Sequence, residues 1–550
     1  MIRSSLLTRL FPQCRSCGVK LQTVDKTRPG YFVAGVAKQP LAKTQKYDEL
    51  ESKLSDADRA LLGLGPSAAT SAKAHSHDSE STTAPECTRC RDVQYRSQMV
   101  QPLPPLGFHE MMDYVDPTAP VVVVVSALDF PLGFDGGIFR HRSPIDVRVV
   151  VNKADLWFST NQKASKYGAT FFEDYFAHKH GIPRHNVAVV SAKLGWNVAK
   201  LASWLPQDAH VVGHVNSGKS TLVGQLQLQH LRHEGDVPLT SSQRRQLEKL
   251  QDKGIHTTKA SMKKRLHEKM ASVVGPGTSY MPGYTRGVIA TDISATKTIY
   301  DVPGFDVASG HGVFGLLNAQ QSAEGRHQFK HVSKGAKVFD KGDHWAHYES
   351  VTKRGQVLSF GGLFGVEFPG GIFQVRNVTA IEPTKFRDYA KFDAVRAAPS
   401  AYDGMESKFF GVGSENLTRY IIPPFYGPVD VVLRGLGHLS ITPTGRKESN
   451  DAIAVYLPPH LDAVARQPIT GYIAKSLTGR DKNGNVLRKE NMKKSTSALR
   501  RYAAKTPLTA QLIPSPSQAH DAAAIAEWSG IPYDDSTVID EHNRYDYWRE

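Results

Sequence analysis

Gly213-His-Val-Asn-Ser-Gly-Lys-Ser220 is the stretch that decides the fold, because it has the spacing G-x-x-x-x-G-K-S. It follows a short apolar run, His210–Val212, and precedes a helical pattern over Thr221–Gln229. In a loop of this spacing, glycines let backbone N–H groups surround phosphates, the lysine neutralises their charge and the final hydroxyl holds Mg²⁺. The stretch therefore predicts a nucleoside-triphosphate site, with Lys219 and Ser220 as its charged and metal-binding side chains.

Short β-branched runs alternate with helical stretches from about residue 100 to about residue 310. The expected strands are Val121–Val125, Val147–Val151, Val187–Val190 and His210–Val212. This alternation is typical of a parallel sheet covered by helices, whose functional loops lie at the carboxyl ends of the strands. We therefore expect an α/β domain over residues 96–330.

Two loops after these strands carry residues suited to reading guanine. Asn152-Lys-Ala-Asp155 follows the second strand and Ser191-Ala-Lys193 follows the third. A carboxylate can accept bonds from two guanine N–H groups that adenine lacks, and a site built on such bonds discriminates by roughly 10⁴–10⁵. The predicted base-reading residues are Asn152, Lys153, Asp155, Ser191, Ala192 and Lys193.

A further loop, Asp301-Val-Pro-Gly304, offers a carboxylate to Mg²⁺ and a glycine N–H to the γ-phosphate. Thr285 completes the metal sphere; Thr278 is the alternative, but the distance from Thr285 to Asp301 suits one strand and a turn. The predicted phosphate-binding and catalytic residues are Gly213, Asn216, Ser217, Gly218, Lys219, Ser220, Thr221, Thr285, Asp301 and Gly304. Of these, Ser220, Thr285 and Asp301 are the expected Mg²⁺ ligands.

The order of these motifs predicts a circularly permuted P-loop GTPase domain. The base-reading loops precede the phosphate loop, the threonine and the Asp301 loop (G4-G5-G1-G2-G3), whereas an ordinary GTPase has the phosphate loop first. Permutation is tolerated because domain termini usually lie close together. Asp301–Phe305 then leads directly into the C-terminal region, so the nucleotide state could set that region's position. Phe305 stands where a water-orienting glutamine would act, so we expect slow intrinsic hydrolysis.

The four cysteines form two Cys-x-x-Cys pairs, Cys14/Cys17 and Cys87/Cys90. Two such knuckles are typical of a structural zinc site with four cysteine ligands, here over residues 14–95, although two unrelated thiol pairs are the alternative. A polar segment at about 52–86 separates them and is expected to be a disordered insertion. Its His75 and His77 are more simply linker residues than metal ligands.

The C-terminal region has Gly-rich turns between short apolar runs, which predicts a separate β-rich domain over residues 331–470. The expected strands are Val357–Phe360, Gly371–Val378, Val429–Leu433 and Ala452–Leu457. A tail over residues 471–550 follows. It is basic over Arg480–Lys505 and then acidic, and its last thirty residues are expected to be loosely ordered.

Charge and the N-terminus indicate partner and compartment. Sixty-eight Lys and Arg residues against 53 Asp and Glu give +15, which favours a polyanionic partner such as RNA or an anionic membrane over a merely basic protein. Residues 1–24 contain arginines and a lysine but no acidic residue, as in an organelle import signal, expected over residues 1–13. We expect the mitochondrial matrix, with the plastid as alternative. Cleavage beyond Cys17 would remove half of the metal site. No apolar run approaches the roughly 20 residues of a membrane span.

Taken together, these motifs resemble the YqeH-type circularly permuted GTPases, a family of bacterial and organellar assembly factors for the small ribosomal subunit. The resemblance also covers Cys14–Val19, Leu21–Thr23, Arg354–Leu363 and Val431–Gly437. It implies GTP, Mg²⁺, Zn²⁺, a K⁺ ion held by Asn216, and a C-terminal domain that contacts RNA. Three departures are the 69 residues between the cysteine pairs, a basic insertion at about 227–270, and Val302 where the family has Thr.

The resemblance implies a GTP-hydrolysing assembly factor that binds the precursor of the mitochondrial small ribosomal subunit, its rRNA and other assembly factors. Nucleotide state would control this binding. Two alternatives are a large-subunit assembly factor and a GTP-fold RNA-binding protein with little turnover, which Phe305 permits. A GTPase acting on a membrane or a metabolic enzyme is a third, against which the lack of a lipid-anchor motif or span argues.

Overall fold

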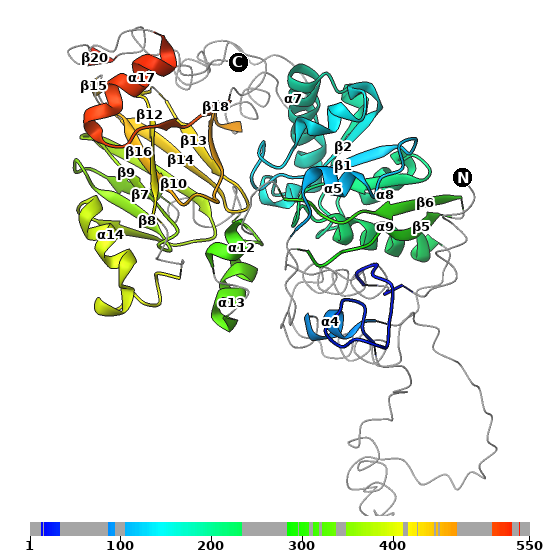
Figure 1. The fold of residues 1–550 in the computed structure, drawn as a ribbon. Helices are drawn as coiled ribbons and strands as arrows, with labels where there is room; N and C mark the ends of the chain where they lie inside the picture. The colour runs from blue at the N-terminus through cyan, green and yellow to red at the C-terminus, as the bar shows by residue number, and fades with distance from the viewer. Residues whose placement is uncertain are drawn as a thin grey trace, which may run out of the picture. The chain divides into compact units, whose positions relative to one another are not determined.

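The computed structural model describes residues 13–14, 16–32, 86–93, 105–233, 283–294, 296–306, 312–317, 322–336, 348–410, 416–425, 427–444, 447–448, 451–469, 509–530 and 538–539 (Figure 1). The chain separates into two compact units, one containing most of residues 1–96 and the other residues 97–550. Several predictions concern residues outside the described ranges: the import signal over 1–12, the insertion over 52–85 with His75 and His77, Thr278, and Arg480–Lys505.

A six-stranded sheet organises the N-terminal half of the larger unit (residues 105–336). Its strands are β1 Val121–Ser126, β2 Val147–Asn152, β3 Val187–Val189, β4 Ala209–Val212, β5 Ile289–Ser294 and β6 Lys297–Asp301. Their order is β3-β2-β1-β4-β6-β5, with only β5 antiparallel to its neighbour. The first four strands match the predicted ones to within a residue at each end, because runs of β-branched side chains suit strands that are buried on both faces.

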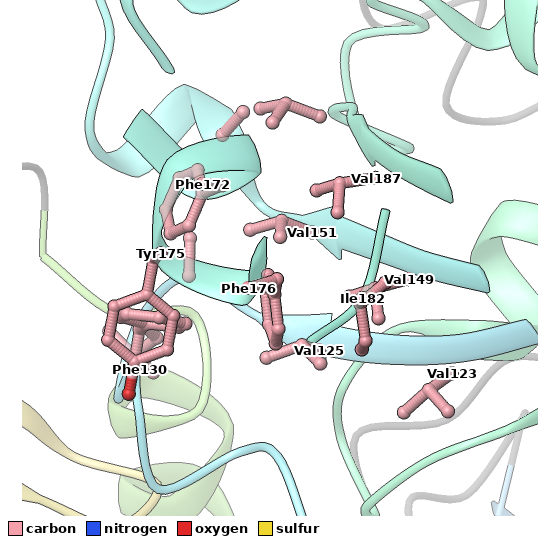
Figure 2. Packing of buried hydrophobic residues seen from close by; sticks show 14 of the residues in the cluster. Val123, Val125, Phe130, Val149, Val151, Phe172, Tyr175, Phe176, Ile182 and Val187 are labelled. Carbon is pink, nitrogen blue, oxygen red and sulfur yellow. The ribbon is translucent and has the colours of Figure 1, made fainter. Parts of the chain in front are cut away.

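Helices cover both faces of this sheet, and successive residues of a strand serve opposite faces. On one face, Phe172 and Phe176 of α7 (Ala169–His180) pack against Val125 and Val151 (Figure 2). On the other face, the alternate valines Val122, Val124 and Val150 pack with leucines of α8 (Val198–Trp204) and α9 (Lys219–His233). The sheet is therefore the middle layer of a three-layer α/β arrangement, and the helices leave the loops at the strand ends uncovered by either layer.

Shorter elements complete this half and the cysteine region. They are α4 Thr88–Arg91, α5 Phe108–Met112, η2 Gly136–Arg140, η3 Pro144–Asp146, η4 Ala154–Leu156, α6 Asn161–Lys163, η5 Ala164–Gly168, η6 Arg184–Asn186, α12 Gly312–Leu316 and α13 Ala323–Val332. Helix α9 extends to His233, so the first seven residues of the predicted insertion at 227–270 belong to a regular helix. None of the helices in the described ranges is long and apolar enough to cross a membrane.

Two antiparallel six-stranded sheets make up the C-terminal half (residues 348–539). One has the order β18-β17-β13-β14-β10-β7, the other β11-β8-β9-β16-β12-β19, and β15 pairs with β20. The strands are β7 Tyr348–Val351, β8 Val357–Phe360, β9 Phe364–Glu367, β10 Ile372–Thr379, β11 Pro383–Phe386, β12 Thr418–Ile422, β13 Val429–Leu433, β14 Gly437–Thr444, β15 Lys447–Glu448, β16 Ile453–Leu457, β17 Ala463–Arg466, β18 Thr509–Gln511, β19 Ile513–Pro514 and β20 Val538–Ile539. The helical elements are α14 Tyr389–Ala397, η7 Pro399–Ala401, η8 Gln518–His520 and α17 Asp521–Ser529.

Residues 509–530 correct the predicted tail, because they complete both sheets instead of forming a loose end. Strand β18 pairs with β17, β19 pairs with β12, and α17 follows. The segment is anchored by Asp521, which accepts two hydrogen bonds from the guanidinium of Arg419 at 2.6 and 2.9 Å and one from Ser515 Oγ at 2.6 Å. At least one acidic residue of this segment, Asp521, therefore forms a buried ion pair with a residue about a hundred positions earlier in the chain.

The two halves of the larger unit share a buried core, which differs from the separate β-rich domain expected. Val378 of β10 and Ile469 belong to the same apolar cluster as Val125 and Val151. The imidazole of His438 on β14 stacks on the indole of Trp157 with ring centroids 5.2 Å apart. A core of this kind makes the C-terminal half part of the support of the α/β sheet.

We expect the buried His438 to make stability depend on pH. Burial lowers its pKa to about 3, although Asp430 opposes the shift, whereas the unfolded chain protonates a histidine below about pH 6.5. The unfolded state thus binds more protons between these values, and this residue costs about 2 kcal/mol of stability between pH 7 and pH 5. Urea unfolding at both pH values should show a smaller loss for His438→Phe than for the wild type, by about that amount. Equal losses in the two proteins would contradict this account.

Candidate functional site

The phosphate loop joins the carboxyl end of β4 to the start of α9. Gly213 and Gly218 have φ values of 150° and 90°, and a Cβ atom on either would lie 2.4 Å from a neighbouring atom. The loop therefore requires glycine at both positions. Lys219 Nζ donates to the carbonyls of Gly213 at 2.8 Å and His214 at 3.0 Å, so the loop curls around the ammonium group. Burial lowers the pKa of Lys219 to about 8, against the opposing effect of Asp301.

Three predicted Mg²⁺ ligands come together beside this lysine. Ser220 Oγ donates to Asp301 Oδ2 at 2.6 Å and lies 3.3 Å from Thr285 Oγ1. Asp301 is fully buried, and its Oδ1 has no hydrogen-bond partner among the described residues. Burial raises its pKa to about 6, although Lys219 and Ser220 favour the charged form. Two hydroxyls and a carboxylate with a spare oxygen fit a small hard cation such as Mg²⁺, which prefers oxygen ligands.

The predicted base-reading residues lie at the same edge of the sheet and contact one another. Asp155 Oδ1 accepts a hydrogen bond from Ser191 Oγ at 2.6 Å. The amide of Asn152 accepts from Ala192 N at 3.0 Å and donates to the carbonyl of Ser217 at 3.1 Å. Both base-reading loops are therefore tied to each other and to the phosphate loop.

The remaining predicted residues border this arrangement. Lys153 adopts φ 63°, and burial lowers its pKa against the effects of Asp129 and Asp155. Lys193 is exposed and Thr221 lies in the first turn of α9. A Cβ atom on Gly304 would stand 3.0 Å from Lys219 Nζ, which places that backbone beside the lysine. Asn216 has φ 60°, a conformation that asparagine tolerates well and that agrees with a turn residue.

Around the phosphate loop lie Phe305, which the sequence already indicated, and several residues that motif reading missed, namely His214, Arg434 and Asp129. Phe305 is buried, and its ring lies 4.2 Å from that of His214. Arg434 of the C-terminal half donates to the carbonyl of Leu132 at 2.8 Å and lies 3.4 Å from the His214 ring, while Gly435 N donates to Asp129 Oδ2 at 2.9 Å. Asp129 follows β1, where the rule that ligands bind at strand carboxyl ends could have found it. The contacts of Arg434 with Leu132 and His214 span 302 and 220 residues and have no local signal.

Four cysteines gather in the N-terminal region despite their wide spacing. Cys14, Cys17, Cys87 and Cys90 are all buried, and their Sγ atoms lie within 4.8 Å of one another. The Sγ atoms of Cys14 and Cys90 are 3.8 Å apart, and tetrahedral zinc–sulfur bonds of about 2.3 Å would place the sulfurs about 3.8 Å apart. The N–H of Cys87 also points at Cys14 Sγ, 3.3 Å away. The two pairs are therefore one cluster, and its donor set fits zinc.

These features define a mixed α/β protein with several sheets and a cysteine cluster near its N-terminus. Family models for the C-terminal and N-terminal domains of genetic interactor of prohibitins 3 match residues 346–530 and 13–101. Proteins named Genetic interactor of prohibitins 3, mitochondrial, are similar along almost the whole chain. That of Debaryomyces hansenii is 37% identical over 99% of this chain and 94% of its own length, and that of Scheffersomyces stipitis 34% over 100% and 96%.

The chain therefore belongs to the genetic interactor of prohibitins 3 family. A third relative, from Clavispora lusitaniae, is 39% identical over 94% of this chain and 85% of its own length, and it carries the same mitochondrial name. The predicted mitochondrial location is confirmed, and the plastid alternative is wrong. The two family models leave residues 102–345 between them, so the resemblance to permuted GTPases remains a prediction.

We expect the purified chain to contain about one zinc ion, as a closed site of four thiolates holds its metal in the folded protein. Cys87→Ser should lower the zinc content and the thermal midpoint together, because a hydroxyl is a poor replacement for a thiolate ligand. Metal analysis by mass spectrometry and a thermal melt would measure both. A chelator should reproduce the effect on the wild type, and zinc addition should reverse it. Zinc-free protein with undiminished stability would remove the site.

The contact between Asp155 and Ser191 predicts a change of base preference. Asp155→Asn keeps an oxygen that Ser191 can bond but exchanges the other acceptor for a donor. GTP affinity should fall at least about 100-fold, while xanthosine triphosphate should gain affinity. Calorimetric titration would measure both nucleotides. Asp146→Asn, an exposed carboxylate at the opposite end of β2, is the matched control and should bind GTP as the wild type does. Unchanged GTP affinity in Asp155→Asn would contradict the base-reading assignment.

Proposed function

We propose that the protein binds and slowly hydrolyses GTP and, in its GTP-bound form, acts as an assembly factor for the mitochondrial small ribosomal subunit. One observation carries the enzymatic part of this proposal. Ser220, Thr285 and Asp301 meet beside Lys219, and the same loop is bonded to the predicted guanine-reading loops through Asn152. These residues are scattered over about 150 positions in the sequence and share one edge of the sheet, which supports their assignment to one triphosphate site.

In the proposed site, different residues would bind the phosphates, the metal ion and the base. Lys219 would neutralise the β- and γ-phosphates, and N–H groups of the phosphate loop and Gly304 would bind phosphate oxygens. Ser220, Thr285 and Asp301 would hold Mg²⁺, which supplies further positive charge to the phosphates. Asp155 and Ser191 would select guanine.

Turnover would be slow without a partner. The buried Phe305 offers no polar group that could orient water, which supports this expectation. Asn216 is a candidate K⁺ ligand beside the phosphates. Faster hydrolysis in potassium than in sodium would support this role, and equal rates would leave Asn216 as a turn residue.

The ribosomal part of the proposal rests on charge, compartment and resemblance. The net charge of +15 favours a polyanion such as rRNA, and the protein is mitochondrial. The two C-terminal motifs of the resemblance are largely internal, since Val357–Phe360 and Val431–Leu433 are buried strand residues. They would therefore shape the C-terminal half, and RNA would contact the surface that they support. Other assembly factors would join the same particle.

A second candidate function follows from the relatives' name, genetic interactor of prohibitins. By this similarity, the chain would act in a mitochondrial process that also depends on prohibitins. Loss of the chain should then be aggravated by loss of a prohibitin, while ribosomal profiles report the first function independently.

Sedimentation through a density gradient tests the ribosomal proposal. With a non-hydrolysable GTP analogue, the protein should co-migrate with the small-subunit precursor, and with GDP most of it should stay at the top. Nucleotide must bind the docked state better than the free state, because equal affinity shifts no population. Lys219→Ala should lower analogue-dependent co-migration at least about tenfold, since the lysine serves phosphate binding. The affinity of the protein for the particle should fall steeply as the salt concentration rises, as it does for other contacts with nucleic-acid phosphates.

The same gradient contains the contradicting outcomes. Co-migration with the large subunit would replace the small subunit as the particle that is assembled and would leave the proposed GTPase activity standing. RNA binding that ignores the nucleotide, together with no measurable hydrolysis, would favour a GTP-fold RNA-binding protein. Absence from both subunits in every nucleotide state would overturn the assembly-factor proposal.

A further inference from the structure

Trp157 lies between the two halves of the larger unit. Its indole is parallel to the imidazole of His438, at an interplanar angle of 8°. The guanidinium of Arg466 on β17 stands 5.4 Å from the centroid of the same indole. Trp157, His438 and Arg466 are 1%, 3% and 0% exposed, so all three side chains are enclosed by protein. Two residues of the C-terminal half therefore fix the position of one residue of the N-terminal half.

Trp157 is also close to the predicted base-reading carboxylate in the chain. Asp155 lies in η4, a single turn of 3₁₀-helix, and Trp157 closes that turn by donating its N–H to the carbonyl of Ala154 at 3.1 Å. The indole Nε1 donates to the carbonyl of Ala127 at 2.5 Å. A single 3₁₀ turn has few bonds of its own, so its orientation depends on the groups to which it is anchored. The Trp157 side chain is such an anchor.

The C-terminal half holds a second loop of the same edge, the one after β1. Arg466 donates to the carbonyl of Phe130 and, at 2.7 Å, to Asp430 Oδ2. Gly435 N donates to Asp129 Oδ2, and the charge of Asp129 counteracts the lowering of the Lys153 pKa by burial. Both Lys153 and Asp155 thus have neighbours that are held from the C-terminal half.

We propose that the C-terminal half sets the base specificity of the nucleotide site, with His438 and Arg466 as positioning residues for Asn152–Asp155. They act through Trp157 and do not touch the place of the base. This inference rests on the proposed function, since it presupposes that the loop reads guanine. Asn152 joins the base-reading loop to the phosphate loop, but the phosphate side also has supports that do not involve Trp157, namely the contact of Lys219 with the loop after β4 and that of Ser220 with Asp301 on β6. Displacement of the base-reading loop should therefore change base selection more than phosphate binding.

The test uses the full chain and two ribose-labelled fluorescent nucleotides, GTP and ATP. The ratio of their dissociation constants measures base preference, and competition by inorganic triphosphate measures phosphate binding alone. His438→Leu removes the flat ring while keeping an apolar side chain of similar volume, and His438→Phe restores a ring that can stack on Trp157. Leu439→Ala is the matched control, because Leu439 is the next residue on β14, is buried, and faces the opposite side of the sheet.

We expect His438→Leu to lower the preference for GTP about tenfold, because small displacements of a positioned group have effects of this order or larger. Triphosphate affinity should change less, by no more than about twofold, because the contacts of Lys219 and Asp301 do not pass through Trp157. His438→Phe should restore the preference, and Leu439→Ala should keep it even if it lowers the thermal midpoint. This split between base and phosphate binding is not expected from a general loss of stability.

Three outcomes would overturn the inference. A wild type without GTP binding would remove the proposed function and the inference with it. A wild type that selects GTP, with unchanged selection in His438→Leu, would overturn the inference alone. An equal loss of GTP preference in Leu439→Ala would show that His438 acts only as a residue of the core and not as a positioning residue. If His438→Leu does not fold, Trp157→Phe takes its place in the test, since it keeps a ring but loses the bond to Ala127. Unchanged selection of GTP by Trp157→Phe would also overturn the inference.

Discussion

The side-chain amide of Asn152 is the interaction on which the rest of the site depends. Its Nδ2 donates to the carbonyls of Ser217 at 3.1 Å and Gly218 at 3.3 Å, and its Oδ1 accepts from the backbone N–H groups of Lys153 and Ala192. Three loops from three strands therefore meet on one planar group with all of its bonding directions in use. An amide can do this because it carries two donors and two acceptor positions, and aspartate, which only accepts, cannot.

The sheet makes this meeting possible, since it brings the carboxyl ends of β2, β3 and β4 to one edge. Valine-rich runs indicate these strands, because a strand that is buried on both faces must be apolar on both. Helices α7, α8 and α9 pack against those faces. The strands and the motifs at their ends were therefore readable from local sequence. So was the cysteine cluster, because a Cys-x-x-Cys pair carries its own geometry even when 69 residues separate it from its partner.

The features that sequence reading missed depend on contacts between distant residues. The acidic segment around Asp521 looks like a solvated end until its partner Arg419 is placed beside it. Arg466 looks like one more basic residue, yet it is fully buried between Asp430 and the carbonyl of Phe130. Composition gives the charge of such residues and not their neighbours, so a buried ion pair across a sheet leaves no local pattern. The contacts that join the two halves, such as the stack of His438 on Trp157, likewise link distant residues, so the sequence pattern indicated a separate domain.

The shared core would also limit how the proposed nucleotide could act on the C-terminal half. Separation of the halves would expose the part of Trp157 that His438 and Arg466 cover, together with Val378 and Ile469, and exposure of apolar surface costs about 25 cal/mol per Å². Coupling free energies between sites are typically about 1–3 kcal/mol, which corresponds to the exposure of only about 40–120 Å² of apolar surface. The free-energy argument thus favours a fixed junction around Trp157, with movement confined to segments that contribute less to the core. In the proposed GTPase, a signal from the phosphates would then pass along Gly304 and Phe305, and the junction around Trp157 would stay closed.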